Sequence, residues 1–178
     1  MRISILICTM PERKRMLDGL CMSLHHEAFK EDAELIIDGR MGVTTGKKRN
    51  DLLVKAKGEY VVFIDDDDEC SGEYIPRILH ATKASPDCIG IQGTMTTNGK
   101  NEKQWYISKD CKTWHEKNGI YYRTPNHISP VRTSIALRVG FPDISFGEDY
   151  QYSMGILPFL KTEIKVEKNI YHYKFVHK

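Results

Sequence analysis

The 178-residue sequence predicts an α/β fold with a mixed, mostly parallel sheet flanked by helices. In the first half, short apolar runs alternate with segments of helical periodicity, which is the pattern of repeated β-α-β units. In the second half, Asn-Gly pairs separate β-rich runs, which favours an antiparallel hairpin added to the sheet. Because no internal repeat or low-complexity linker interrupts the chain, we predict a single domain over residues 1–178.

Three short apolar runs in the first half are typical of buried strands. They are residues 3–8, residues 34–37 and residues 60–64. Each is followed within a few residues by polar or charged side chains. We therefore expect the carboxyl ends of three parallel strands to lie at one edge of the sheet.

Helical segments connect and follow these strands. Pro11 begins a helix whose apolar residues recur at i, i+3, i+4 and i+7 as far as residue 24. Thr44 or Thr45 caps a second helix that runs to about residue 57, where Gly58 ends it. Apolar residues between 75 and 79 predict a third helix.

The second half contains predicted hairpins, two helices and two terminal strands. Asn98-Gly99 and Asn118-Gly119 are the turn pairs. The predicted elements are strands at 89–97, 104–108 and 120–122, helices at 133–139 and 148–160, and strands at 163–166 and 170–176.

The most informative feature is a run of five carboxylates, residues 65–69, directly after a buried strand. Carboxylates roughly 5 Å apart repel by about 0.8 kcal/mol per pair even in water. On a strand, Asp65 and Asp67 share one face while Asp66 and Asp68 point to the other. Hard cations such as Mg²⁺ and Mn²⁺ bind carboxylate oxygens and share their remaining positions with phosphate. The run therefore indicates a cation or ligand site; the alternative is a solvated acidic turn.

Other polar residues follow the predicted strands at the same edge. Thr9 and Arg13 follow the first strand, and Asp38 ends the second. Ligands of open α/β sheets bind outside the carboxyl ends of the strands. Taken singly, these residues are explained as a helix cap, a surface charge and an Asp-Gly turn; together they favour a binding site.

Candidates in the second half each have two interpretations. Glu148 and Asp149 stand in the first turn of a predicted helix, where carboxylates stay ionised. In the first interpretation one of them acts as a general base. In the second they only stabilise the helix. Near the C-terminus, His172 and His177 lie on opposite strand faces, and either is a metal ligand or a structural residue.

Two tryptophans complete the set of candidates. Trp105 and Trp114 have two interpretations: side chains that stack on sugar rings, or side chains that pack in an aromatic core.

The composition narrows the class of protein. Lys and Arg number 26 against 24 Asp and Glu, a net charge of +2, which argues against a protein that wraps nucleic acid. Five scattered cysteines without zinc spacing favour a reduced, cytoplasmic protein. No apolar run is long enough to span a membrane, so we expect any membrane association to be peripheral.

At this point four segments in register resemble family 2 glycosyltransferases of the GT-A fold. The resemblance covers nearly the whole chain and includes an Asp-x-Asp motif. The segments are Ile3-Ser4-Ile5-Leu6-Ile7-Cys8-Thr9; Arg49-Asn50-Asp51-Leu52 with Ala56-Lys57-Gly58-Glu59-Tyr60; Val62-Phe63-Ile64-Asp65-Asp66-Asp67-Asp68-Glu69; and Val139-Gly140-Phe141 with Gly147-Glu148-Asp149.

The resemblance implies a metal-dependent, inverting transfer of sugar from a nucleotide-diphosphate sugar, commonly a UDP-sugar, to a hydroxyl of a glycan or other acceptor. It implies that Asp149 is the general base and that Glu148 is a second catalytic or acceptor-binding residue. The implied nucleotide-sugar residues are Thr9, Arg13, Asp38, Arg49, Asp65 and Asp66, although side-chain alternation turns Asp66 away from Asp65.

The same resemblance assigns the cation, Mn²⁺ or Mg²⁺. Asp67 would hold it against the leaving diphosphate, with Asp68 as a second contact and His177 or His172 as a histidine ligand. Trp105 and Trp114 remain acceptor-binding candidates.

Departures from the family pattern limit the interpretation. Only one acidic residue, Asp38, precedes Gly39, and no QxxRW segment follows Met154-Gly155, which argues against a processive synthase. Two other functions stay open: a nucleotidyltransferase acting on a nucleoside triphosphate, and a non-catalytic nucleotide-sugar or glycan-binding module.

Overall fold

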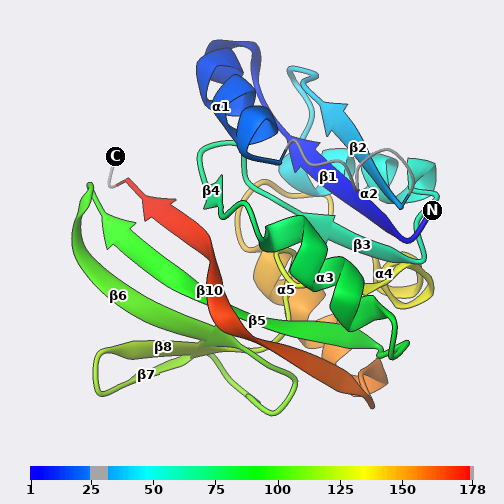
Figure 1. The fold of residues 1–178 in the computed structure, drawn as a ribbon. Helices are drawn as coiled ribbons and strands as arrows, with labels where there is room; N and C mark the ends of the chain where they lie inside the picture. Colours follow the sequence, from blue (N-terminus) through cyan, green and yellow to red (C-terminus); the bar gives the residue numbers. More distant parts are fainter. Residues whose placement is uncertain (25–31, 177–178) are drawn as a thin grey trace.

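The computed structural model describes residues 1–24 and 32–176, and its elements follow the predicted order (Figure 1). The elements of the first half are β1 (Ile3–Cys8), η1 (Pro11–Arg13), α1 (Lys14–Leu24), β2 (Ala33–Asp38), α2 (Thr45–Lys55), β3 (Tyr60–Phe63), β4 (Glu69–Cys70) and α3 (Tyr74–Thr82). Those of the second half are β5 (Cys88–Thr97), β6 (Lys100–Ile107), β7 (His115–Lys117), β8 (Ile120–Arg123), β9 (Val131–Arg132), α4 (Thr133–Val139), α5 (Glu148–Ile156), η3 (Leu157–Phe159) and β10 (Glu163–Phe175).

The described strands form one mixed sheet of ten strands. Eight of them follow the order β2-β1-β3-β9-β5-β6-β8-β7, and the other two join through β10, which pairs with β5 and with β4. The strands β2, β1 and β3 run parallel, as predicted. Beyond them, β9 pairs antiparallel with β3, and β5 and β6 form the predicted hairpin around Asn98-Gly99. The last strand, β10, runs parallel to β5. The predicted fold class is confirmed.

Side-chain alternation on the central strands divides the core into two layers. Ile3, Ile5 and Ile7 of β1 face one layer, whose helical residues come from α1 and α3. Leu6 of β1 faces the other layer, whose helical residues come from α2, α4 and α5. Figure 1 shows α3 in front of the sheet and α4 and α5 behind it. Because both faces are covered, β1 and β3 are buried along their length, as their continuous apolar runs predicted. The third predicted run is only partly buried, because β2 lies at the edge of the sheet and Ile37 is 41% exposed.

The structure differs from the sequence prediction at several elements. The two predicted terminal strands are one strand, β10, whose register with β5 shifts between Lys165 and Tyr171. The predicted helix at 148–160 ends as an α-helix at Ile156, and a 3-10 turn containing Pro158 follows it. The two-residue strands β4 and β9 were not predicted, because two residues carry no periodicity.

The second half of β10 lies against the acidic run. Its residue Tyr171 pairs with Cys70 of β4, one residue beyond the five carboxylates. On the other side of β10, a side chain at Gly93 of β5 would meet the carbonyl oxygen of Tyr171 at 2.0 Å, so the close approach of the two backbones requires glycine there. Among the described residues, no helix has the length and apolar content needed to cross a bilayer.

Candidate functional site

The loops after β1 and β3 meet at one edge of the sheet, as predicted. The hydroxyl of Thr9 donates to Asp66 Oδ2 at 2.6 Å, and Arg13 donates to Asp66 Oδ1 at 2.6 Å. Lys48 of α2 reaches the same place, because its buried ammonium donates to the carbonyl oxygen of Thr9 at 2.8 Å. Both oxygens of Asp66 are thus occupied, and its exposed fraction is 2%. The predicted direct contact of Asp66 with a nucleotide sugar is therefore not supported.

The acidic run forms a turn instead of continuing the strand. The amide of Asp68 donates to the carbonyl oxygen of Asp65 at 3.1 Å. The side chains of Asp65 and Asp67 are 32% and 30% exposed, whereas Asp66 and Asp68 are buried. The predicted division into two pairs is correct, although a turn and not strand alternation produces it.

Arg49 of α2 lies beneath this turn. One of its guanidinium nitrogens is 3.3 Å from Asp65 Oδ1, and another is 3.1 Å from Glu148 Oε1. Its guanidinium carbon lies 5.5 Å from the centre of the Phe63 ring and 5.3 Å from that of Phe141. Arg49 is 4% exposed. The prediction that it contacts the nucleotide is therefore not supported; Arg49 holds two carboxylates together from below.

His127 was not predicted, and it connects the acidic run to α5. It lies in the loop between β8 and β9, with Nε2 3.2 Å from Asp65 Oδ2 and Nδ1 3.9 Å from Asp149 Oδ2. The one signal in the sequence is weak, namely a histidine between two prolines. It does not indicate that the loop returns to β3.

Glu148 and Asp149 begin α5, as predicted, and their environments differ. Glu148 is buried against Arg49, whereas the side chain of Asp149 is 29% exposed and receives the amide of Tyr150 on Oδ1 at 2.8 Å. Burial raises the pKa of Glu148, and the Arg49 charge opposes that rise. Asp149 is the carboxylate of this pair that solvent and ligands can reach.

The carboxyls of the acidic run differ in pKa. Burial by itself would raise the pKa of Asp65, but the neighbouring His127 and Arg49 hold it below its usual value. Burial raises the pKa of Asp67, and the nearby charge of Arg13, 3.1 Å from Asp67 Oδ2, partly offsets the rise. The Asp65 carboxylate already has Arg49 and His127 as partners in the protein, whereas the Arg13 that lies beside Asp67 also pairs with Asp66.

Asp68 joins the acidic run to the last strand. The hydroxyl of Tyr171 donates to Asp68 Oδ2 at 2.7 Å, and the amide of Lys174 donates to Oδ1 at 2.8 Å. Burial and the charge of Asp65 raise the pKa of Asp68 to about 8. With both oxygens occupied by β10, Asp68 is not placed to be the predicted second metal contact.

Three further candidates have partners inside the protein. Asp38 receives Arg40 on both oxygens, and these hydrogen bonds lower its pKa. Both ring nitrogens of His172 contact threonine hydroxyls, at 2.8 Å and 3.2 Å, which argues against a role as metal ligand. Trp105 is 4% exposed in the core and donates to a backbone carbonyl, so it cannot stack on an acceptor. His177 lies outside the described residues.

Trp114 lies among exposed aromatic residues close to the start of α5. Its ring contacts Tyr150 edge-on at a centroid distance of 5.4 Å, and the guanidinium of Arg123 lies 4.4 Å from its ring centre. Tyr150 follows Asp149 directly and is 49% exposed, and Phe146 is 90% exposed. We call Trp114 and Tyr150 the aromatic patch. Its position beside Asp149 keeps Trp114 as an acceptor-binding candidate.

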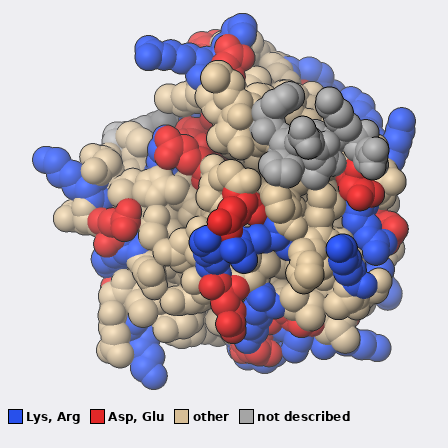
Figure 2. All heavy atoms as spheres, in the orientation of Figure 1, with Lys and Arg blue, Asp and Glu red and all other residues tan. Residues whose placement is uncertain are grey.

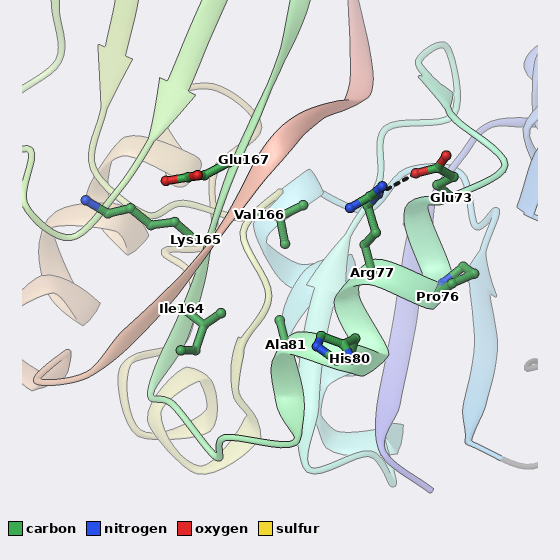
Figure 3. A pocket seen from close by; sticks show the side chains of 9 residues that line it. All are labelled: Glu73, Pro76, Arg77, His80, Ala81, Ile164, Lys165, Val166 and Glu167. Carbon is green, nitrogen blue, oxygen red and sulfur yellow. Dashed lines mark hydrogen bonds and ion pairs between the residues drawn. The ribbon is translucent and has the colours of Figure 1, made fainter.

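Other surface features lie away from these residues. A shallow groove of about 390 Å³ lies between α3 and the first half of β10, with the Glu73–Arg77 ion pair at its rim (Figure 3). None of the candidate residues lines it. On the face drawn in Figure 2, acidic and basic side chains alternate, and neither sign forms a continuous area. This face offers no extended basic surface for nucleic acid.

The donor set at the acidic run fits a cation that is shared with a ligand. Among residues 1–24 and 32–176, no group of three or more His, Cys, Asp or Glu side chains converges to hold a metal ion. Mg²⁺ is commonly bound by one or two carboxylates together with substrate phosphates and water. The part-exposed carboxylate of Asp67 matches that requirement, and the buried carboxylates do not.

Comparison with known families identifies the class of protein. Residues 27–147 match the family model described as glycosyl transferase family 2. The match covers more than half of the chain, so the chain belongs to this family. A search of curated proteins found no match.

Crystal structures of TarS from S. aureus share the fold. TarS 1-349 in complex with UDP-GlcNAc aligns with a TM-score of 0.74 and 18% identity, over 100% of this chain and 60% of that chain. TarS 1-349 in complex with UDP gives a TM-score of 0.71 and 19% identity over 98% and 60%. A longer TarS structure gives 0.69 and 16% over 98% and 37%. The likeness confirms a GT-A type fold, and this chain spans 60% of the length of TarS 1-349.

The raised pKa of Asp68 predicts how the unfolding free energy of the protein changes with pH. An aspartate in an unfolded chain has a pKa of about 3.9, whereas that of folded Asp68 is about 8. Between these values the folded state holds a proton that the unfolded state has released, so the contribution of this group to stability falls as pH rises. Asp68→Asn removes this dependence. We expect the unfolding free energy of the variant, relative to the wild type, to increase from pH 4 to pH 8 in urea titrations. A difference that stays constant over this range would contradict the assignment.

Proposed function

We propose that this protein transfers a sugar from a nucleotide-diphosphate sugar, most simply a UDP-sugar, to an acceptor hydroxyl. The observation that carries the proposal is that the part-exposed Asp65 and Asp149 lie on either side of the His127 ring, with the part-exposed Asp67 in the same acidic turn as Asp65. Membership of glycosyl transferase family 2 supports the reaction class. The UDP and UDP-GlcNAc complexes of the structurally similar TarS support the choice of donor.

The donor side of the proposed site is the acidic turn. Asp65 is held by Arg49 and His127 with one side exposed, which suits an acceptor of hydrogen bonds from ribose hydroxyls. Arg13 is 32% exposed beside Asp67 and offers a cation near the diphosphate. Asp67 would hold Mn²⁺ or Mg²⁺, which when bound stabilises the negative charge that develops on the leaving diphosphate.

Asp149 is the proposed general base. An acceptor hydroxyl becomes an effective nucleophile when a carboxylate removes its proton. The oxygen then forms a bond to the anomeric carbon as the bond from that carbon to the diphosphate breaks, and the bonding electrons leave with the diphosphate. A single displacement of this kind inverts the anomeric carbon. Glu148 supports the reaction indirectly, because it is buried against Arg49.

The aromatic patch is the proposed acceptor surface. Trp114 and Tyr150 present aromatic faces and edges next to Asp149, and sugar rings pack on such surfaces through their apolar C–H faces. The acceptor is therefore expected to carry at least one sugar ring or another apolar ring beside the reacting hydroxyl.

Nucleotide binding tests the donor half of the proposal. Calorimetric titration with UDP is expected to show tighter binding when Mn²⁺ is present. Asp67→Asn keeps the size of the side chain and removes its charge, so it should abolish most of the Mn²⁺ effect while binding without metal changes little. As a control, Asp18→Asn changes an exposed carboxylate on α1 and should bind as the wild type does. UDP binding that is absent, or the same with and without Mn²⁺, would contradict a cation shared with the diphosphate.

Replacement of Asp149 by Asn tests the acceptor half. We expect the transfer rate to fall by about 10² to 10⁴, the usual contribution of a general base. The dissociation constant for UDP should stay within about threefold, because Asp149 is placed to contact the acceptor. The measurement is the release of UDP from a panel of UDP-sugars with and without glycan acceptors. Release of pyrophosphate from nucleoside triphosphates would instead support a nucleotidyltransferase, and loss of UDP binding would remove Asp149 from the base role.

A further inference from the structure

His127 lies between the two halves of the proposed site. Its backbone carbonyl accepts the amide of Phe63 at 2.8 Å, which fixes the loop to the end of β3. Its ring is 10% exposed, with Nε2 directed at Asp65 and Nδ1 directed at Asp149. One imidazole therefore faces a donor-side carboxylate at one nitrogen and the proposed base at the other.

The loop that carries His127 is also fixed to α5, the helix that carries Asp149. The hydroxyl of Ser153 on α5 donates to the carbonyl oxygen of Pro125 at 2.7 Å and also contacts the hydroxyl of Thr124. Thr124 in turn accepts a hydrogen bond from Trp114 at 2.8 Å. Movement of the loop relative to either β3 or α5 would break buried hydrogen bonds, so the ring position is defined on both sides.

The Nδ1 atom of His127 is buried and, within the described residues, has no hydrogen-bond partner. A buried polar atom without a partner is unfavourable, and the nearest carboxylate oxygen, Asp149 Oδ2, is 3.9 Å away. Carboxylate oxygens only accept hydrogen bonds, so a proton on Nδ1 would satisfy both atoms when Asp149 moves slightly toward the ring.

We propose that His127 is a positioning residue that orients Asp149 through Nδ1 while its Nε2 holds Asp65. The proposal rests on the proposed transfer reaction. Asp149 Oδ1 already receives the amide of Tyr150, so a contact from His127 to Oδ2 would fix the plane of the carboxylate. Each carboxylate oxygen has two lone-pair positions, so one position remains for the acceptor proton.

Two substitutions separate the two contacts. The side-chain amide of Asn places its nitrogen close to the position of Nδ1 in histidine, and the longer side chain of Gln places its nitrogen close to that of Nε2. His127→Asn therefore keeps a donor toward Asp149 and loses the one toward Asp65. His127→Gln does the reverse. His80→Asn, at an exposed histidine of α3, is the matched control.

The experiment measures kcat for sugar transfer and the dissociation constant of UDP for all four proteins, with a thermal melt for each. We expect His127→Gln to lower kcat by about 100-fold, the effect of a misplaced catalytic group, while UDP binds within about threefold of the wild type. We expect His127→Asn to weaken UDP binding and to lower kcat much less than His127→Gln does. The control should match the wild type in both.

Two results would overturn the inference. The first leaves the proposed function standing, and the second contradicts the proposed function as well. If the wild type transfers sugar and the Asn and Gln variants share the same kcat, whether lowered or unchanged, His127 does not act through Asp149. If the wild type transfers no sugar from any nucleotide sugar, the proposed function fails and the inference fails with it. The thermal melts control for general destabilisation. If both variants lose the same melting temperature, destabilisation alone cannot explain a loss of kcat in one variant and weaker UDP binding in the other.

Discussion

Arg49 is a buried guanidinium that lies against two aromatic rings and pairs with Asp65 and Glu148. A buried ion pair contributes little net stability, but removing one partner leaves an uncompensated charge and costs about 3–5 kcal/mol. Asp65 lies in the turn after β3 and Glu148 in α5, so the Arg49 contacts join two distant parts of the chain at one point. The remaining carboxylates of the site are arranged around this pairing: buried ones have partners in the protein, and Asp67 and Asp149 stay accessible.

The fold explains why this pairing occurs at the edge of the sheet. Parallel strands β2, β1 and β3 end together, and α2 starts behind the same edge, which places a buried basic residue below the acidic turn. The last strand then reaches the turn from the other side and is attached to it through Tyr171 and Asp68. An enzyme site benefits from such rigid support, because small displacements of catalytic groups lower rates strongly. The same contacts that stabilise the turn therefore determine where a donor and a base can meet.

Much of the fold follows from local patterns, whereas the roles of single residues depend on contacts across the sheet. Apolar runs and helical periodicity were sufficient to predict β1, β3 and α2, because burial on both faces imposes those patterns. The acidic run stood out because five carboxylates directly after a buried strand are unusual. Asp149 was singled out by the family resemblance, since carboxylates are common at helix starts. His127 was missed because nothing in its neighbourhood indicates that its loop hydrogen bonds to β3. Trp105 had two interpretations, acceptor stacking and core packing, because a sequence cannot tell a buried tryptophan from an exposed one; the structure supports the second.

In the proposed site, donor and base lie on opposite sides of one carboxylate network, and a crystal structure of the protein with UDP and Mn²⁺ tests this most directly. It should show the diphosphate and the metal ion at the Asp67 carboxylate and the ribose beside Asp65. It should also show Arg49 still buried and paired with Glu148, and Asp149 within hydrogen-bond distance of His127. A nucleotide bound in the groove between α3 and β10, or a metal ion without contact to Asp67, would contradict the account.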